Sequence, residues 1–208
     1  MYDFIADLDE YFCEKYANYD KLCILPGYKM PKMQTSEVRE DGRTYAYTLP
    51  ANTMRLALQE NKVELLALLK TQMLDLTPSF SFNPQSIFAQ IRNRFSKYGF
   101  LKNFKKVMAK YNLTNEEILE KINISDEIWG NILKQKFLPS KNLILSLALV
   151  GHFSYEDTVA LLSFCNYEFE YSVVKDVIIS YLLKEKIFNE EMRARALAEY
   201  KVANLFIK

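Results

Sequence analysis

The sequence is poor in glycine, proline, cysteine and histidine, the residues that mark linkers, disulfide frameworks and many metal sites. Its 208 residues include five glycines, six prolines, three cysteines and one histidine. So few glycines and prolines leave little room for long linkers. The cysteines (Cys13, Cys23 and Cys165) show no Cys-x-x-Cys spacing, which indicates free thiols in a reducing compartment. We therefore expect no disulfide, no metal site and a cytoplasmic location.

The chain also lacks a strong net charge and a long apolar run. Its formal net charge of +1 gives no whole-molecule attraction to phosphate. The longest nearly uninterrupted apolar run, Leu143–Val150, is far shorter than the about 20 residues that cross a bilayer. The first residues, MYDFIADLDEYF, are acidic and amphipathic, unlike a secretory signal. Half of the residues are apolar and a quarter are charged, so we expect a globular protein that does not enter a membrane.

Recognisable catalytic motifs are missing as well. The sequence has no phosphate-cradling glycine loop and no Gly-x-Ser-x-Gly. The one histidine, His152, follows Gly151 and has no partner at ligand spacing, so we interpret it as a surface-turn residue. We expect no catalytic residue, no cofactor and no metal. Because carboxylates distant in sequence can meet in space, an enzyme with a site in the N-terminal half is kept as the least favoured hypothesis.

Helical periodicity is the main pattern present, and it predicts a mainly α-helical fold. Residues 2–16 alternate apolar and acidic side chains at helical spacing. The period disappears after this segment. Asp41-Gly42 then lies between two short alternating runs, which predicts a β-hairpin over about 36–48 with a type I′ turn, or else an irregular loop. Helical patterning returns from Pro50 to Leu74.

A further helix is expected over about 85–96, with Pro84 at its first turn. We place the domain boundary directly after it. Residues 1–96 would form an N-terminal helical region with a hairpin or irregular segment. Residues 97–208 would form a helix-turn-helix-like domain with a C-terminal helical extension.

Basic residues are concentrated between Pro78 and Leu113, where no acid occurs. One interpretation is a surface that faces phosphate, as on nucleic acid. The more ordinary interpretation is a solvated helix face offset by acids elsewhere in the fold. The basic residues are Arg92, Arg94, Lys97, Lys102, Lys105, Lys106 and Lys110.

The centre of the chain carries a series of helix start signals. Thr114 and Glu117 form a capping box, in which each side chain satisfies a backbone N–H of the other residue. Asn123 is expected at the following turn in a left-handed conformation. Ser125 would cap the next helix, with Trp129 and Ile132 facing inward.

Further caps are expected at Ser140 and Ser154, with Gly151 ending the helix between them. Two C-terminal helices follow, one from about Val173 and one opened by Asn189. We expect the apolar tail after them to be docked, because a free one would be a liability. Its apolar residues are Val202, Leu205, Phe206 and Ile207.

Over about residues 100–165 the order of residues resembles the helix-turn-helix domain of the lambda-repressor-like, xenobiotic-response-element type. The matching positions are Leu113-Thr114-x-x-Glu117-Ile118, Ile124-Ser125, Pro139-Ser140 and Leu143-Ile144-Leu145. The resemblance implies that the helix after Ser125 takes the place of the recognition helix, whose first residues enter the major groove.

This helix departs from the family pattern in the residues that would face DNA. It opens with Asp126 and Glu127, which repel phosphate, although acids also favour the first turn of any helix. Ile128 and Leu133 lie on flanks that a DNA reader keeps polar. These four residues form the predicted protein-interaction surface. The residues expected to contact nucleic acid under the alternative hypothesis are Asn131, Lys134, Lys136, Lys141, Lys105 and Lys106.

The favoured hypothesis is a non-enzymatic, bacterial regulatory or adaptor protein that uses a helix-turn-helix scaffold for contact with another protein or a second copy. The alternative is a DNA-binding transcriptional regulator, expected to be dimeric.

Overall fold

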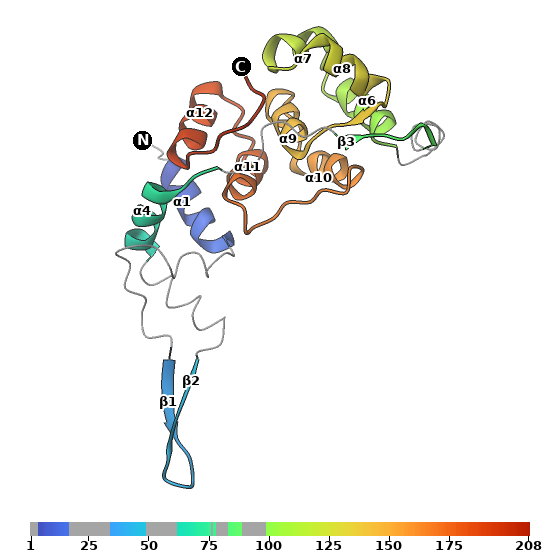
Figure 1. The fold of residues 1–208 in the computed structure, drawn as a ribbon. Coiled ribbons are helices and arrows are strands. Elements are labelled where there is room, and N and C mark those ends of the chain that lie inside the picture. Colours follow the sequence, from blue (N-terminus) through green and yellow to red (C-terminus); the bar gives the residue numbers. More distant parts are fainter. Residues whose placement is uncertain (1–3, 17–33, 49–61, 76, 78–82, 89–98) are drawn as a thin grey trace. The chain divides into compact units, whose positions relative to one another are not determined.

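The computed structural model describes residues 4–16, 34–48, 62–75, 77, 83–88 and 99–208 (Figure 1). The fold is mainly helical with a small antiparallel hairpin, as the sequence predicted. The chain divides into two compact units. Unit 1 comprises the described residues up to Met73 together with Tyr171–Val173, and unit 2 comprises those of Leu74–Glu170 and Val174–Lys208. The division therefore falls at 73/74, whereas the sequence analysis placed it at 96/97.

Among the described residues of unit 1, two helices contact each other, α1 (Phe4–Lys15) and α4 (Lys62–Gln72). The helix expected over 2–16 is confirmed over its described part. Between α1 and α4, the ammonium of Lys70 lies 2.8 Å from one carboxylate oxygen of Asp9. Of the helical pattern expected from Pro50 onward, only the part from Lys62 lies within the described residues. Neither Cys13 nor Cys165 is in a disulfide, and Cys23 lies outside the described residues.

The hairpin of unit 1 is formed by β1 (Gln34–Val38) and β2 (Thr44–Thr48), and Val38 pairs with Thr44. The expected type I′ turn is wrong. Only Gly42 has a positive φ, of 74°, and the amide of Gly42 donates to the carbonyl of Arg39. The amide of Arg39 also donates to the carbonyl of Arg43 at 3.1 Å, so the loop is a three-residue connection over residues 40–42. Its last residue is left-handed, for which a single glycine suffices. Asp41 stabilises the turn by accepting a hydrogen bond from the amide of Arg43 at 2.9 Å.

The first strand of unit 2 pairs with a strand that lies about 50 residues later in the chain. β3 (Asn83–Pro84) pairs antiparallel with β4 (Phe137–Leu138), and the amide of Gln85 donates to the carbonyl of Lys136 at 2.8 Å. Pro84 is therefore a strand residue. The sequence analysis had placed it in the first turn of a helix, which is wrong. Ile87 and Phe88 are helical, but the rest of the helix expected to end near residue 96 lies outside the described residues.

The helices α6 (Phe100–Lys110), α7 (Asn115–Lys121) and α8 (Asp126–Leu133) follow. The capping box at the start of α7 is confirmed. The amide of Glu117 donates to the Thr114 hydroxyl at 3.1 Å, and the amide of Thr114 donates to the Glu117 carboxylate at 2.9 Å. Ser125 caps α8 as expected, since its hydroxyl accepts from the amide of Ile128.

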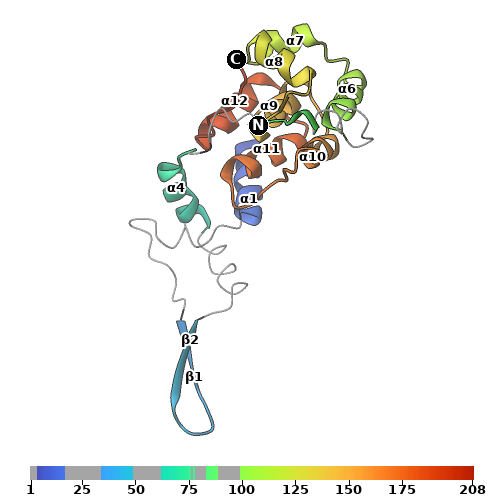
Figure 2. The ribbon, with the colours of Figure 1, turned by 45° about the vertical axis from the view of Figure 1, so that its right-hand side comes forward.

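Helix α9 (Lys141–Val150) is the centre of unit 2 and contacts α7, α10 (Tyr155–Ser163) and α11 (Val174–Lys184). Figures 1 and 2 show α9, α10 and α11 side by side. Every residue of α9 after Lys141 is buried. Ser140 and Ser154 cap α9 and α10, as predicted.

The residue directly after α9, Gly151, has no room for a side chain. A Cβ atom at this position would lie 2.5 Å from a ring carbon of Phe153 and 2.9 Å from a methyl carbon of Leu113. The turn after α9 can therefore close against these two side chains only if it has no side chain of its own.

The C-terminal region consists of α11, α12 (Glu190–Glu199) and a non-helical tail. Both helices agree with the sequence prediction. The tail is docked, as expected: Phe206 is 3% exposed, and its amide donates to the hydroxyl of Ser146 in α9 at 2.9 Å. Ile207 forms an antiparallel bridge with Ile122.

The connection between α7 and α8 differs from the prediction. Asn123 was expected to adopt a left-handed conformation, but it is not among the residues with positive φ. The backbone at Ile122 is extended instead, with φ −108° and ψ 130°. The amide of Asn123 donates to the carbonyl of Phe206. An extended connection is favoured here because the C-terminal tail pairs with it and supplies hydrogen-bond partners for its backbone.

Candidate functional site

The first turn of α8 presents two free carboxylates. Asp126 and Glu127 are both exposed, and neither makes an ion pair or a side-chain hydrogen bond within the described part of the chain. Their position at the positive end of the helix dipole stabilises them there without a cationic side chain. This turn is thus an anionic surface available to a partner.

The inner face of α8 fixes how the helix is oriented. Trp129 and Ile132 are buried, 3% and 2% exposed, as predicted. The indole N–H of Trp129 donates to the side-chain oxygen of Asn115 in α7 at 3.2 Å. The Trp129 ring also packs edge-on against Phe104 of α6, with centroids 5.9 Å apart. These contacts hold α6, α7 and α8 together and turn the opposite face of α8 outward.

Ile128 and Leu133 are less exposed than the sequence suggested. Both side chains are half-buried, as expected for residues at the sides of the buried face of α8. Asn131 is half-buried as well, whereas Lys134 and Lys136 are exposed at the end of the helix. The surface of α8 is therefore acidic at its start, basic just beyond its end, and partly apolar along its flanks.

The remaining lysines of the nucleic-acid hypothesis lie in different environments. Lys105 and Lys106 are exposed on α6. Lys141 is only 17% exposed in its side chain, and its ammonium lies 2.5 Å from Asp176 and 2.8 Å from Glu170. This ammonium is already neutralised within unit 2, and a phosphate would have to compete with two carboxylates.

The basic segment of the sequence is only partly described. Lys110 is offset by Asp157, 2.6 Å away, which agrees with the ordinary interpretation for this one residue. Lys102, like Lys105 and Lys106, is exposed and forms no ion pair with any described residue. Arg92, Arg94 and Lys97 lie outside the described residues.

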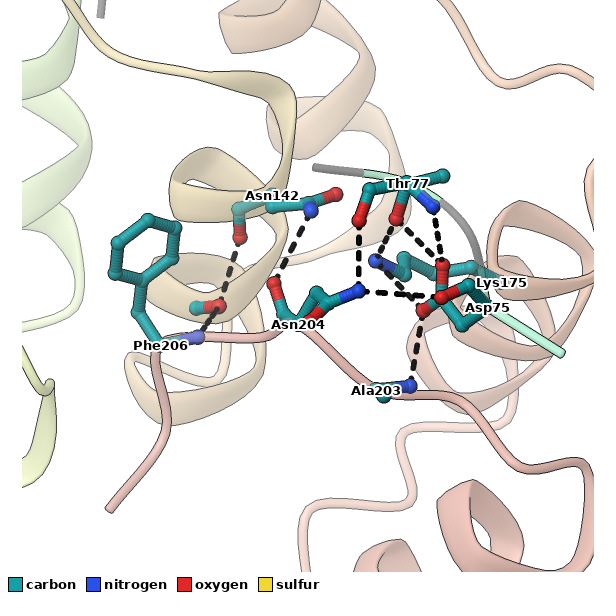
Figure 3. A network of polar contacts seen from close by, with 8 residues as sticks. Asp75, Thr77, Asn142, Lys175, Ala203, Asn204 and Phe206 are labelled. Atoms are coloured by element: carbon teal, nitrogen blue, oxygen red, sulfur yellow. Dashed lines mark hydrogen bonds and ion pairs between the residues drawn. The ribbon is translucent and has the colours of Figure 1, made fainter. Parts of the chain in front are cut away.

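A buried polar network lies next to the C-terminal tail of unit 2 (Figure 3). The ammonium of Lys175 lies 2.9 Å from a carboxylate oxygen of Asp75 and donates to the hydroxyl of Thr77 at 2.6 Å. The amide of Ala203 donates to Asp75 at 2.9 Å. Asn204 donates to the carbonyl of Thr77 at 2.6 Å. The network fastens the tail to the first residues of the unit.

Burial and hydrogen bonding act in opposite directions on the two charged groups of this network. Burial lowers the pKa of Lys175, an effect that the hydrogen bond and charge of Asp75 oppose. Burial by itself would raise the pKa of Asp75, but hydrogen bonds from Thr77, Lys175 and Ala203 outweigh it, so the pKa lies below its usual value. The lowered pKa of Asp75 favours its carboxylate form beside Lys175, and the charge and hydrogen bond of Asp75 oppose the effect of burial on Lys175.

The sequence analysis missed this network. A usable signal was present in α11, where Lys175 and Asp176 interrupt a helix that is buried continuously as far as Leu183. Charged residues inside an apolar stripe are seldom fully buried unless they are paired. The pattern could have indicated buried ion pairs, but it could not identify Asp75 or Lys141 as the partners.

The described residues contain no group of three or more His, Cys, Asp or Glu side chains that could hold a metal ion. Nor does any described helix combine the length and the apolar character that crossing a membrane requires. His152 is an exposed turn residue with φ 55°, as the sequence analysis interpreted it.

Comparison with known proteins gives no relative. The chain matches no protein-family model, no curated protein and no solved structure.

Proposed function

We propose that this chain is a non-enzymatic regulatory or adaptor protein in which α8, on a helix-turn-helix scaffold, contacts another protein. The observation that carries the proposal is the pair of exposed, unpaired carboxylates of Asp126 and Glu127 in the first turn of α8. On such a scaffold this turn approaches DNA, where two negative charges oppose the phosphates. A polypeptide with basic side chains is the better counterpart.

The flanks of α8 support the same kind of partner. Ile128 and Leu133 are half-buried, so a partner would complete the burial of apolar surface that unit 2 leaves partly exposed. Lys134 and Lys136 make the other end of the helix basic, so the surface is acidic at one end and basic at the other. This charge distribution favours one orientation of the partner.

Photo-crosslinking tests this proposal. A benzophenone amino acid replaces Glu127 in α8 or, as a matched control, Glu191, an exposed acid in the first turn of α12. We expect a defined protein to be crosslinked from position 127 and not from 191. The purified pair should then bind in solution, and Asp126→Lys/Glu127→Lys should weaken binding without changing Trp129 fluorescence. Crosslinking only to nucleic acid from position 127 would contradict the proposal.

DNA binding is the second candidate, and the exposed lysines favour it. Lys102, Lys105, Lys106, Lys134 and Lys136 are exposed and have no ion-pair partner among the described residues. Duplex binding that weakens steeply with salt, and that Lys134→Gln/Lys136→Gln reduces, would support this candidate.

A further inference from the structure

A cavity of about 300 Å³ lies in unit 2, lined by residues from the end of α7, the turn after α9, the start of α12 and the C-terminal tail. Its volume is at the lower end of the range of small-molecule pockets, about 300–1,000 Å³. Helix α8 does not contribute to its lining. The cavity is therefore separate from the surface proposed for the protein partner.

Arg193 of α12 is the unusual group in this cavity. It is only 8% exposed, yet its guanidinium makes no hydrogen bond or ion pair within the part of the chain that the structure describes. Buried charges in proteins are normally paired. Burial lowers the pKa of Arg193, and the negative charge of Glu190 opposes this effect without forming a close ion pair. The cavity is thus lined by a nearly buried cation whose guanidinium has no partner among the described residues.

Two more groups bring positive charge and a flat apolar surface to the same cavity. Lys121, at the end of α7, is exposed and its ammonium has no partner among the described residues. The ring of His152 stacks on Phe188, with centroids 4.7 Å apart and an angle of 14°. Burial, followed by the charges of Lys121 and Arg193, lowers the pKa of His152, so the imidazole is neutral at pH 7.

The side chains around the cavity carry both signs of charge. The side-chain cations are Lys121, Arg193 and Lys208, and the side-chain acids are Glu120 and Glu190. The Lys208 ammonium donates to the carbonyl of Leu119 at 2.6 Å and is therefore held in place. Lys121 and Arg193 are the cations with free donors.

We propose that this cavity binds a small organic anion, whose carboxylate or phosphate group is held by Arg193 and Lys121 and whose body lies against the stacked His152 and Phe188 rings. An Arg guanidinium offers paired donors that match either oxyanion. Binding would satisfy the donors of Arg193. The site stands independently of any protein partner of α8.

The single histidine makes the test direct, because the imidazole NMR signals of the chain come from His152 alone. Inorganic phosphate and acetate are titrated separately into the full chain at constant ionic strength, with chloride as the background anion. We expect a saturable shift of the His152 signals with at least one of them, and a rise in the pKa of His152 when the anion is bound. A response to phosphate alone would assign the site to phosphorylated ligands, and a response to acetate alone to carboxylates.

Matched variants establish where the anion binds. Arg193→Gln should weaken binding about 10- to 100-fold, the range for loss of charged hydrogen bonds. Arg195→Gln, at an exposed position in the same helix, should leave the affinity unchanged. Lys121→Gln changes an exposed residue, so it tests the site even if Arg193→Gln fails to fold, and it should also weaken binding. No saturable shift with either anion, or equal affinity in the wild-type protein and the Lys121→Gln variant, would overturn the proposal.

Discussion

The ammonium nitrogen of Lys175 lies 2.9 Å from a carboxylate oxygen of Asp75, and neither side chain is more than 6% exposed. The pair joins α11 to the segment that opens unit 2. Removing one member leaves the other charged and buried, which in other proteins costs about 3–5 kcal/mol.

Asp75→Asn should therefore lower the free energy of unfolding by about 3–5 kcal/mol. Urea denaturation followed by the fluorescence of Trp129, the only tryptophan, measures the change. Glu168→Gln is the control, because Glu168 is exposed and makes no interaction with a described residue. Its effect should stay within about 0.5 kcal/mol. An equally small effect of Asp75→Asn would show that the pair does not support the fold.

Two glycines should respond to alanine in opposite directions. Gly151→Ala places a Cβ 2.5 Å from Phe153 and 2.9 Å from Leu113, so it should destabilise the protein by about 1–3 kcal/mol. Gly130 lies inside α8, and a Cβ there meets no atom within 4 Å. Gly130→Ala should therefore stabilise by up to about 1 kcal/mol through helix propensity. Thermal unfolding of the two variants, measured side by side, would show melting temperatures moving apart.

The capping box of α7 predicts a dependence of stability on pH. Hydrogen bonds from the backbone amide and hydroxyl of Thr114 hold the pKa of Glu117 below its usual value. The ionised carboxylate therefore stabilises the fold at pH values above its unfolded pKa. This contribution is lost as the pH falls through the folded pKa.

Glu117→Gln should lower the urea midpoint at pH 7, and the difference from the wild-type protein should shrink as the pH falls below the ordinary range of a Glu pKa. Glutamine keeps the shape of the side chain but cannot ionise. The control is Glu120→Gln, at an exposed position close to the end of the same helix. A Glu117→Gln difference that stays constant from neutral to acid pH would exclude this contribution.

Reversing the charges at the start of α8 tests the proposal that this turn takes the place that faces the DNA groove in a helix-turn-helix domain. In Asp126→Lys/Glu127→Lys, we expect duplex DNA binding to appear, because under this proposal two cations would face the phosphates. The log–log dependence of affinity on salt should have a slope near −2, since each phosphate contact contributes about −0.9. Fluorescence anisotropy at several salt concentrations measures it.

The matched control is Glu168→Lys/Glu191→Lys, which changes two exposed acids outside α8. Each replacement adds two charges, so both double variants change the formal net charge from +1 to +5. Equal DNA binding by the two variants would attribute the effect to total charge and would contradict a special position for α8.

The elements that the sequence predicted well are those specified by neighbouring residues. Ser125, Ser140 and Ser154 each cap the helix that follows, through a hydrogen bond that spans three residues. Trp129 and Ile132 face inward because their spacing places them on one side of a single helix. Such signals are complete within a short stretch of chain and do not depend on the rest of the fold.

The predictions that failed concern contacts between residues far apart in the sequence, or short patterns that fit more than one backbone conformation. Asn123 was expected to be left-handed, but the tail from Phe206 onward pairs with this connection and favours an extended backbone. Asp41-Gly42 fits more than one hairpin loop, and the loop formed needs a positive φ at Gly42 alone. The partners of Lys141 and Lys175 could not be inferred, because no local pattern records which charges meet in space. Buried ion pairs and cavities therefore could not be predicted from the sequence.

The attachment of the tail also bears on how unit 2 folds. The hydrogen bonds from Ala203 to Asp75 and from Asn204 to Thr77 connect residues 128 and 127 positions apart in the chain. Contacts between such distant residues close large loops, and a high proportion of them slows folding. The helices around α9 can therefore pack first, through contacts between residues closer in sequence. We expect the attachment of the C-terminal tail to Asp75 and Thr77 to be the late step of folding.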